Sequence, residues 1–184
     1  MALTSIEICA GAGGQALGLE QAGFDHLAVV EIDHHACNTL RENRPHWNVI
    51  EGDVVPWIKE HAHEYRGVDL VAGGVPCPPF SSAGKQLGAD DERDLFPAMI
   101  ELVRVVRPRA IMIENVRGLL DPKFQEYRKG VEEHLAEIGY SLQWKLLQAS
   151  DFGVPQLRPR VIAVGFRDDV SVSFNYPTPQ PLPA

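Results

Sequence analysis

Short apolar stretches alternate with amphipathic stretches along almost the whole chain. The apolar stretches predict strands at residues 3–9, 26–32, 47–50, 68–73, 110–114, 141–148 and 161–166. The amphipathic stretches predict helices at residues 13–22, 34–42, 56–65, 95–106 and 124–138. Strands that alternate with helices are typical of a mostly parallel sheet with helices on both faces. We therefore expect an α/β, doubly wound, Rossmann-like fold.

Three segments do not follow this alternation. Residues 76–92 and 151–160 are expected to be loops, and the first is longer than most connections, which favours a functional role. Residues 176–184 are rich in proline and are expected to be an unpacked tail or linker. The length of 184 residues suits one domain, which we place at residues 1–175.

Composition restricts the class of protein further. The formal net charge is −8, the opposite of a generic nucleic-acid binder, so any phosphate contacts would need a local basic face or a separate module. Neither an apolar run long enough to span a membrane nor a signal peptide is apparent. The cysteines, Cys9, Cys37 and Cys77, are odd in number and far apart, which predicts a reducing, cytoplasmic protein.

Glycines and acids follow the first three predicted strands in order. Ala10, Gly11, Gly13 and Gly14 form a turn into the first helix, where glycines let a nucleotide-like ligand approach the backbone. Glu31 ends the second strand and could accept both hydroxyls of a ribose, whereas Asp53 follows the third, where an adenine amino group would lie. Each acid alone could equally cap a helix. The three features together favour an adenosine-containing cofactor.

A single cysteine stands between prolines directly after the fourth strand. Pro76, Cys77 and Pro78 follow a glycine pair, and proline restricts φ, so the thiol would be held on a stiff loop. The end of a strand in an open α/β sheet is a common place for a nucleophile. A lone cysteine here could also be a buried residue of a turn, and only the rest of the chain favours the nucleophile.

These motifs, with residues 114–116 and 156–160, occur in the order found in DNA (cytosine-5)-methyltransferases, and the chain resembles that family from about residue 5 to 166. The resemblance implies the S-adenosylmethionine-dependent methyltransferase fold and the cofactor S-adenosyl-L-methionine. It also implies a cytosine flipped out of duplex DNA and methylated at carbon 5. The cofactor-binding residues implied are Ala10, Gly11, Gly13, Gly14, Glu31, Ile32, Asp53, Val54, Pro76, Leu95 and Asn115.

The resemblance also assigns catalytic roles. Cys77 would add to carbon 6 of the cytosine, although an ordinary thiol is only about 3% thiolate at pH 7. Glu114 would donate to ring nitrogen 3, which requires a raised carboxyl pKa; alternatively it caps the next helix. Of Arg158 and Arg160, which would share one side of an extended chain, one would bind the base or sugar-phosphate and the other would brace Glu114.

Remaining expectations concern the substrate and possible partners. Ser81, in the loop 76–92 that resembles the segment closing over DNA, and Gln156 are expected to contact substrate. Cys9 replaces an aromatic residue that usually packs on the adenine, and Pro78 replaces a glutamine. The histidines lack metal-ligand spacing, so no metal site is expected. The expected location in a prokaryotic cell is the cytoplasm, in association with the nucleoid.

Family members continue into a target-recognition domain and a final helix, which nothing in this chain supplies. We therefore expect duplex DNA as one partner, with a second chain or a missing C-terminal segment as another. The alternatives are a non-catalytic remnant that binds cofactor or DNA, and a related tRNA methyltransferase. A nicotinamide dehydrogenase is less favoured because it has no use for Cys77.

Overall fold

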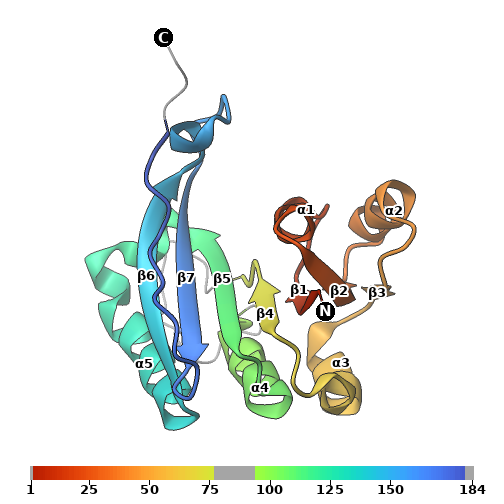
Figure 1. The fold of residues 1–184 in the computed structure, drawn as a ribbon, viewed down its shortest axis with the longest axis horizontal. Helices are drawn as coiled ribbons and strands as arrows, with labels where there is room; N and C mark the ends of the chain where they lie inside the picture. The colour runs from red at the N-terminus through yellow and green to blue at the C-terminus, as the bar shows by residue number, and fades with distance from the viewer. Residues whose placement is uncertain (1, 77–93, 181–184) are drawn as a thin grey trace, which may run out of the picture.

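The computed structural model describes residues 2–76 and 94–180, in which seven strands form one sheet (Figure 1). The order is β3–β2–β1–β4–β5–β7–β6, with β1 to β5 parallel and β7 antiparallel to both neighbours. The strands are β1 (Leu3–Ile8), β2 (Phe24–Glu31), β3 (Val49–Glu51), β4 (Leu70–Gly73), β5 (Ala110–Val116), β6 (Tyr140–Gln148) and β7 (Pro159–Arg167). The expectation of a mostly parallel sheet is confirmed.

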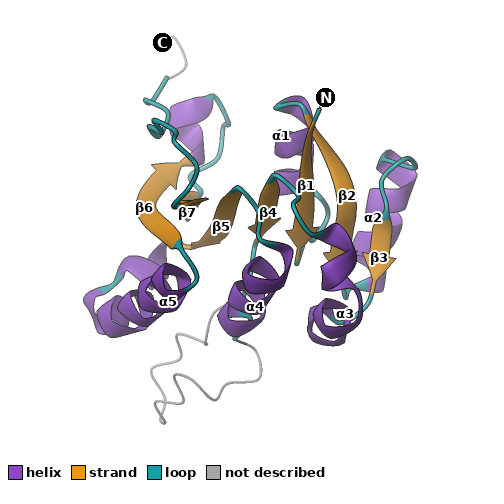
Figure 2. Cartoon of the chain, turned by 60° about the horizontal axis from the view of Figure 1, so that its bottom comes forward, coloured by secondary structure: helices purple, strands orange, loops and turns teal. Residues whose placement is uncertain are grey.

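Helices cover both faces of this sheet, as the alternating pattern predicted (Figures 1 and 2). On one face lie α1 (Gly14–Gln21) and α2 (His34–Asn43). The other face carries α3 (Val54–His61), α4 (Phe96–Val106) and α5 (Gln125–Glu137). The chain reverses its direction across the sheet between β1 and β4, and ligands of open α/β sheets bind at such a switch point, beyond the carboxyl ends of the strands.

Short 3₁₀ helices complete the described part. They are η1 (Ala62–Tyr65), η2 (Arg117–Leu120), η3 (Pro122–Phe124) and η4 (Ala149–Phe152). Within residues 2–76 and 94–180, no helix is long and apolar enough to cross a membrane. Over the same two ranges, no cluster of three or more His, Cys, Asp and Glu side chains could hold a metal ion.

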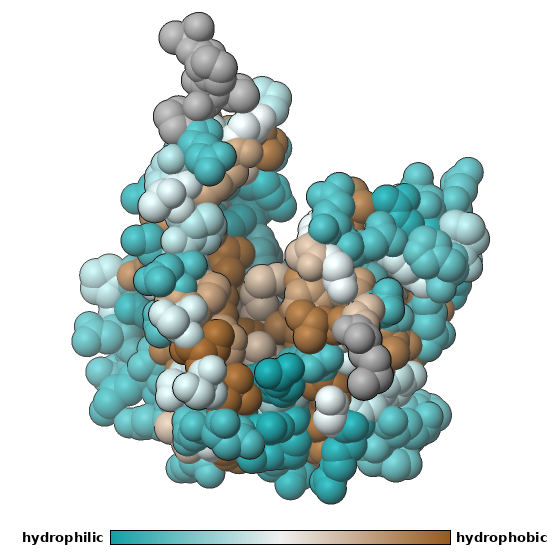
Figure 3. Space-filling view, viewed as in Figure 1, coloured by the Kyte–Doolittle hydropathy of each residue, from teal (hydrophilic) through white to brown (hydrophobic). Residues whose placement is uncertain are grey.

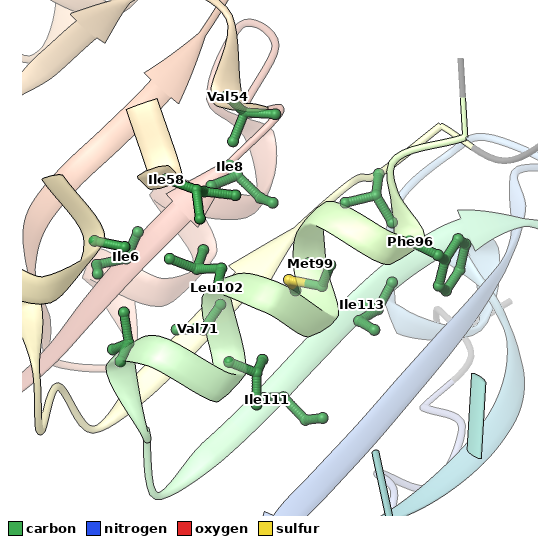
Figure 4. Packing of buried hydrophobic residues seen from close by; sticks show 14 of the residues in the cluster. Ile6, Ile8, Val54, Ile58, Val71, Phe96, Met99, Leu102, Ile111 and Ile113 are labelled. Carbon is green, nitrogen blue, oxygen red and sulfur yellow. The ribbon is translucent and has the colours of Figure 1, made fainter. Parts of the chain in front are cut away.

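The larger hydrophobic core lies between the sheet and the layer of α3, α4 and α5 (Figure 4). Alternate residues of β5 divide between the two faces: Ile111 and Ile113 are fully buried against α4, whereas Met112 and Glu114 face the α1 side with partial exposure. Met99 and Leu102 of α4 fill the same core, with no exposed surface. This packing fixes the carboxyl ends of β4 and β5 next to each other in the middle of the sheet.

Two predicted segments near the expected catalytic residues have different boundaries in the structure. The predicted loop 151–160 is wrong at both ends, because η4 includes Phe152 and β7 begins at Pro159. The fifth strand continues to Val116, so Glu114 lies inside β5 rather than at its tip. The ladder between β5 and β7, in which Val116 pairs with Arg160, extends both strands, and a single-sequence pattern does not reveal such long-range pairing.

The proline-rich tail also differs from expectation, because its first part packs against the β6–β7 hairpin (Figure 1). The rings of Phe174 and Phe166 lie 5.6 Å apart, and the Tyr176 hydroxyl donates to the carbonyl oxygen of Gln143 at 2.7 Å. The Gln180 N–H donates to the Asp151 carbonyl oxygen at 2.6 Å. An extended proline-rich segment can pack through aromatic side chains without joining a strand ladder, so composition alone did not predict this contact.

Candidate cofactor and active site

The glycine turn predicted from the sequence lies at the carboxyl end of β1. Gly11 and Gly13 have φ angles of 55° and 88°, in the left-handed region that favours glycine. A Cβ on Gly13 would lie 2.5 Å from Cδ2 of Leu40, so this glycine lets α1 pack on α2. A Cβ on Gly11 would meet no atom within 4 Å, which leaves the backbone of the turn accessible to a ligand.

Glu31 links the ends of β1 and β2. Its carboxylate accepts hydrogen bonds from the N–H groups of Gly11 at 2.7 Å and of Ile32 and Asp33, each at 2.8 Å. The side chain is buried, so these bonds hold the turn in a fixed position. A carboxylate has about four acceptor positions, so these contacts leave capacity for one further donor. Binding of a ribose by Glu31 stays a prediction.

The other residues expected at the cofactor site follow the carboxyl ends of strands or lie at the start of helices on that side of the sheet. Asp53 is the N-cap of α3 and accepts from the Val55 N–H at 2.8 Å, which is the capping role that the sequence left open. Ile32, beyond the end of β2, is 69% exposed, although its side chain is apolar. Leu95 precedes α4, and its N–H donates to the Pro76 carbonyl oxygen at 3.2 Å. Val54, by contrast, is buried in the core.

The carboxylates of Glu31 and Asp53 give the glycine turn a negative environment. The pKa of the Cys9 thiol is raised to about 12, first by burial and then by the charges of Glu31, Asp53 and Glu7. Cys9 therefore stays a neutral thiol near pH 7 and is unsuited to act as a nucleophile. The same charges favour a ligand that carries positive charge near the turn.

Glu7 is a residue of this region that the sequence analysis missed. It lies in β1 between Ile6 and Ile8, is 1% exposed, and accepts a hydrogen bond from the backbone N–H of Ala16 in the first turn of α1. Gly13, the N-cap of α1, has no side chain to satisfy that turn, so Glu7 caps the helix from the sheet. Burial raises the Glu7 pKa to about 8. The available signal was one acid inside an apolar strand.

A second group of residues surrounds the loop that leads to the expected nucleophile. The Asn115 side-chain amide donates to the Val75 carbonyl oxygen at 2.9 Å, and Asn115 Oδ1 accepts from the Val116 N–H at 2.8 Å. Asn115 is buried and thus fixes the loop after β4 to the end of β5. Cys77 follows Pro76 directly, but Cys77 and Ser81 lie outside the described residues.

Glu114 and Arg160 form an ion pair near this loop. Arg160 Nε lies 2.5 Å from Glu114 Oε1, and both side chains are half-buried, at 25% and 30% exposure. Glu114 Oε2 lies 3.4 Å from the position of a Cβ built on Gly74, three residues before Cys77. Arg160 is therefore the arginine that braces Glu114, one of the two roles that the sequence divided between Arg158 and Arg160.

The structure does not bring Arg158 and Gln156 to this ion pair. Both are exposed in the turn 153–158 at the tip of the β6–β7 hairpin. The Gln156 N–H donates to the Val154 carbonyl oxygen at 2.7 Å, and the Arg158 N–H donates to the Gln156 carbonyl oxygen at 3.0 Å. Because Arg158 precedes β7, the strand alternation that we expected to align it with Arg160 does not apply.

The strand order, the glycine turn at the switch point, Glu31 at the end of β2 and Asp53 after β3 define a Rossmann-like α/β domain with a ligand site at the switch point. Residues 3–183 match the family of C-5 cytosine-specific DNA methylases. The chain is 62% identical over 179 residues to the Type II methyltransferase M.NgoMIV of Neisseria gonorrhoeae, which covers 97% of this chain. The chain belongs to the C-5 cytosine-specific DNA methylase family.

A solved structure shares this fold. The DNMT2 of Spodoptera frugiperda superposes with a TM-score of 0.74 and 25% identity over 94% of this chain. The chain spans 56% of M.NgoMIV and 52% of that DNMT2 chain, about half of each. It spans 75% of another relative, the Type II methyltransferase M.AquIA of Picosynechococcus, to which it is 38% identical. Relatives of this chain therefore differ considerably in length.

The residues around the turn fit S-adenosyl-L-methionine in two respects. The cofactor carries a sulfonium and an ammonium group, which match the carboxylates of Glu31 and Asp53 near Cys9. Its adenine is flat and largely apolar, which matches the exposed Ile32 side chain at the same edge. The open space over Gly11 would admit the ligand to the backbone.

Replacing Gly13 by alanine is expected to lower the free energy of unfolding by about 2–4 kcal/mol. The added Cβ would be strained at φ 88° and would collide with Leu40. Urea unfolding measures the effect. Gly18→Ala in the same helix is the control, because a Cβ there meets nothing within 4 Å and should be neutral or stabilising. Equal effects of the two substitutions would contradict the prediction.

Proposed function

We propose that this chain is the catalytic part of a methyltransferase that transfers a methyl group from S-adenosyl-L-methionine to carbon 5 of cytosine in DNA. Membership of the C-5 cytosine-specific DNA methylase family supports the reaction class. The single observation that carries the proposal is the position of Glu114, held by Arg160 at 2.5 Å and lying against Gly74 of the loop that leads to Cys77. A base that reached Glu114 would lie near that loop.

In this proposal Cys77 attacks carbon 6 of a cytosine flipped out of the duplex. Glu114 supplies a proton at ring nitrogen 3, so that negative charge does not accumulate on the ring and carbon 5 becomes nucleophilic. Arg160 keeps the Glu114 carboxyl in place, and Asn115 holds the Val75 carbonyl oxygen, which fixes the approach of the loop. Cys77 leaves again when carbon 5 loses its proton.

S-adenosyl-L-methionine, when bound, supplies an electrophilic methyl group. We propose that the glycine turn and Glu31 hold its sugar and methionine part, while Ile32, Asp53 and Leu95 surround the adenine. Gly11 and Glu31 are already joined by a 2.7 Å hydrogen bond, so the binding edge is preorganised. Cys9 offers less contact area than an aromatic ring would, which leaves more of the contact to Ile32.

We further propose that another protein segment, in the same polypeptide or a second one, covers the open part of the sheet. Figure 3 shows a hydrophobic hollow between α1 and the column of β6, β7 and residues 170–180. Register places Met112, Glu114, Ile162 and Val164 on this face, and all are partly exposed. Val116, at the same end of β5, is 39% exposed. An apolar hollow beside a charged pair is typical of a surface that receives another element.

Covalent trapping tests the proposal. The chain is mixed with S-adenosyl-L-methionine and a mixed-sequence duplex that contains 5-fluorocytosine, which prevents loss of the substituent at carbon 5 and so retains the adduct. We expect a denaturant-stable adduct that Cys77→Ser does not form. The reaction is run with the chain alone and with the C-terminal part of the Neisseria gonorrhoeae relative added, because that relative is about twice as long.

Each outcome distinguishes one version of the proposal. An adduct with the chain alone supports catalysis without an added segment. An adduct only after complementation supports a catalytic part that needs a covering segment. Binding of S-adenosyl-L-methionine without an adduct in either case would contradict methyl transfer and favour a cofactor-binding module. Competition by tRNA but not by duplex DNA would contradict DNA as the substrate.

A further inference from the structure

Almost every arginine in the described residues uses its guanidinium group within the protein. Those of Arg66, Arg107 and Arg128 donate to main-chain carbonyl oxygens. Contacts with carboxylates are made by Arg41, Arg44, Arg104, Arg109, Arg160 and Arg167. Within residues 2–76 and 94–180, the exceptions are Arg117 and Arg158, whose exposed side chains have neither kind of contact.

These two arginines lie at the same place in the fold. The ladder of β5 and β7 ends at the pair Val116 and Arg160. Arg117 follows Val116 as the first residue of η2, and Arg158 precedes β7 by one residue. The two therefore lie just beyond the end of the ladder that carries the Glu114–Arg160 pair. Leu119, fully buried in the core, anchors η2 and thereby the position of Arg117.

A guanidinium without an internal partner is suited to an external anion, and phosphate is an anion that arginine binds well. A base is joined through its sugar to the phosphates of its own strand, so a cytosine presented to Glu114 would bring phosphates to the surroundings of Glu114. The chain as a whole has a formal charge of −8, which repels a nucleic-acid backbone. Local cations that no carboxylate neutralises are therefore needed where the strand approaches.

We propose that Arg117 binds a backbone phosphate of duplex DNA beside the target nucleotide, next to the base or sugar-phosphate contact that the family resemblance implies for Arg158. The inference rests on the proposed function for the identity of the nucleic acid and adds Arg117 as a DNA-binding residue. Phosphate contacts position the duplex and carry no sequence information, so this surface would act on any target sequence.

The salt dependence of DNA binding tests the inference. Binding of a mixed-sequence duplex is measured by fluorescence anisotropy over a range of salt concentrations for the unsubstituted chain and for Arg117→Gln. Each phosphate contact contributes about 0.9 to the slope of log K against log salt, so Arg117→Gln should make the slope shallower by about that amount. The double variant with Arg158→Gln should show about twice the change. Arg117→Lys keeps the charge and should retain most of the slope.

Arg66→Gln is the matched control, because it removes the same charge at a position before the amino end of β4, where the exposed Arg66 donates to the Val105 carbonyl oxygen. An unchanged slope in Arg117→Gln, or an equal change in Arg66→Gln, would overturn the inference. So would failure of the unsubstituted chain to bind duplex DNA both alone and with the C-terminal part of the Neisseria gonorrhoeae relative added, or binding of tRNA in place of duplex DNA.

The trapping assay, run in parallel, separates this inference from the proposed function. A shallower slope in Arg117→Gln without any Cys77 adduct would support the phosphate contact while contradicting methyl transfer. The opposite result is an adduct formed by the unsubstituted protein together with an unchanged slope in Arg117→Gln. It would support methyl transfer while overturning the phosphate contact.

Discussion

Arg160→Gln should slow formation of the Cys77–cytosine adduct by about 10²-fold or more, within the range attributed to positioned acid–base groups. Arg160 touches Glu114 at 2.5 Å, so removing the guanidinium frees the carboxyl to leave the position from which it would reach ring nitrogen 3. The rate is measured with the duplex containing 5-fluorocytosine, using the form of the protein that supports trapping. Binding of S-adenosyl-L-methionine should change little, because Arg160 lies on β7, away from the glycine turn.

A double-mutant cycle distinguishes positioning of Glu114 from a general loss of structure. Glu114→Gln alone should slow the adduct by about 10²–10⁴-fold. If Arg160 acts through Glu114, then Arg160→Gln should have almost no further effect in the Glu114→Gln protein. Additive effects of the two substitutions would contradict the positioning role. Arg104→Gln on α4 serves as the control, because Arg104 pairs with Glu101 on an exposed helix surface.

The unfolding free energy of Glu7→Gln, relative to that of the unsubstituted chain, should increase as the pH rises from about 4.5 to 8. Burial raises the Glu7 pKa from 4.5 to about 8, so over this interval the folded state holds a proton that the unfolded state has lost. The unfolded state binds fewer protons, so stability falls with rising pH, and the contribution of Glu7 is fully present only below pH 4.5. The total fall is on the order of 5 kcal/mol, since each pKa unit corresponds to about 1.4 kcal/mol.

Glutamine removes this titration and retains an oxygen for the Ala16 N–H, so the difference in unfolding free energy between the two proteins should grow with pH and level off above pH 8. Chemical denaturation at intervals between pH 4 and 9 measures it. Glu42→Gln, at an exposed position of α2, is the control and should run parallel to the unsubstituted chain. A constant difference for Glu7→Gln would show that the buried carboxyl does not titrate in this interval.

The fold was predictable because its elements are local in sequence. Ile111 and Ile113 alternate with less buried neighbours, and the amphipathic spacing of α4 places Met99 and Leu102 on one face. Such periodicities depend only on which residues face a core. The errors fell where distant segments determine the boundary, as in β7, whose first residues are extended by pairing with β5 and β6 rather than by their own preference.

The cofactor-binding residues and the catalytic residues of the site could be predicted from the sequence to different degrees. The glycine turn stood out because glycines let a ligand approach the backbone, and Glu31 and Asp53 stood out because one ends a predicted strand and the other follows one. The sequence predicted that one of two arginines braces Glu114 without identifying which one, and the structure pairs Arg160 with Glu114. Only the register of β5 and β7 brings Arg160, and not Arg158, to Glu114.

The sequence by itself thus determined the order of strands and helices, the position of the glycine turn and the family to which the chain belongs, because these depend on local patterns and on short motifs. The tertiary structure alone decided that Glu7 caps α1 from a buried strand, that residues 174–180 pack on the β6–β7 hairpin, and that Arg117 and Arg158 have no partner within the described chain. Each of these depends on which distant groups meet and how far water is excluded, and neither quantity is encoded in the local alternation of polar and apolar residues.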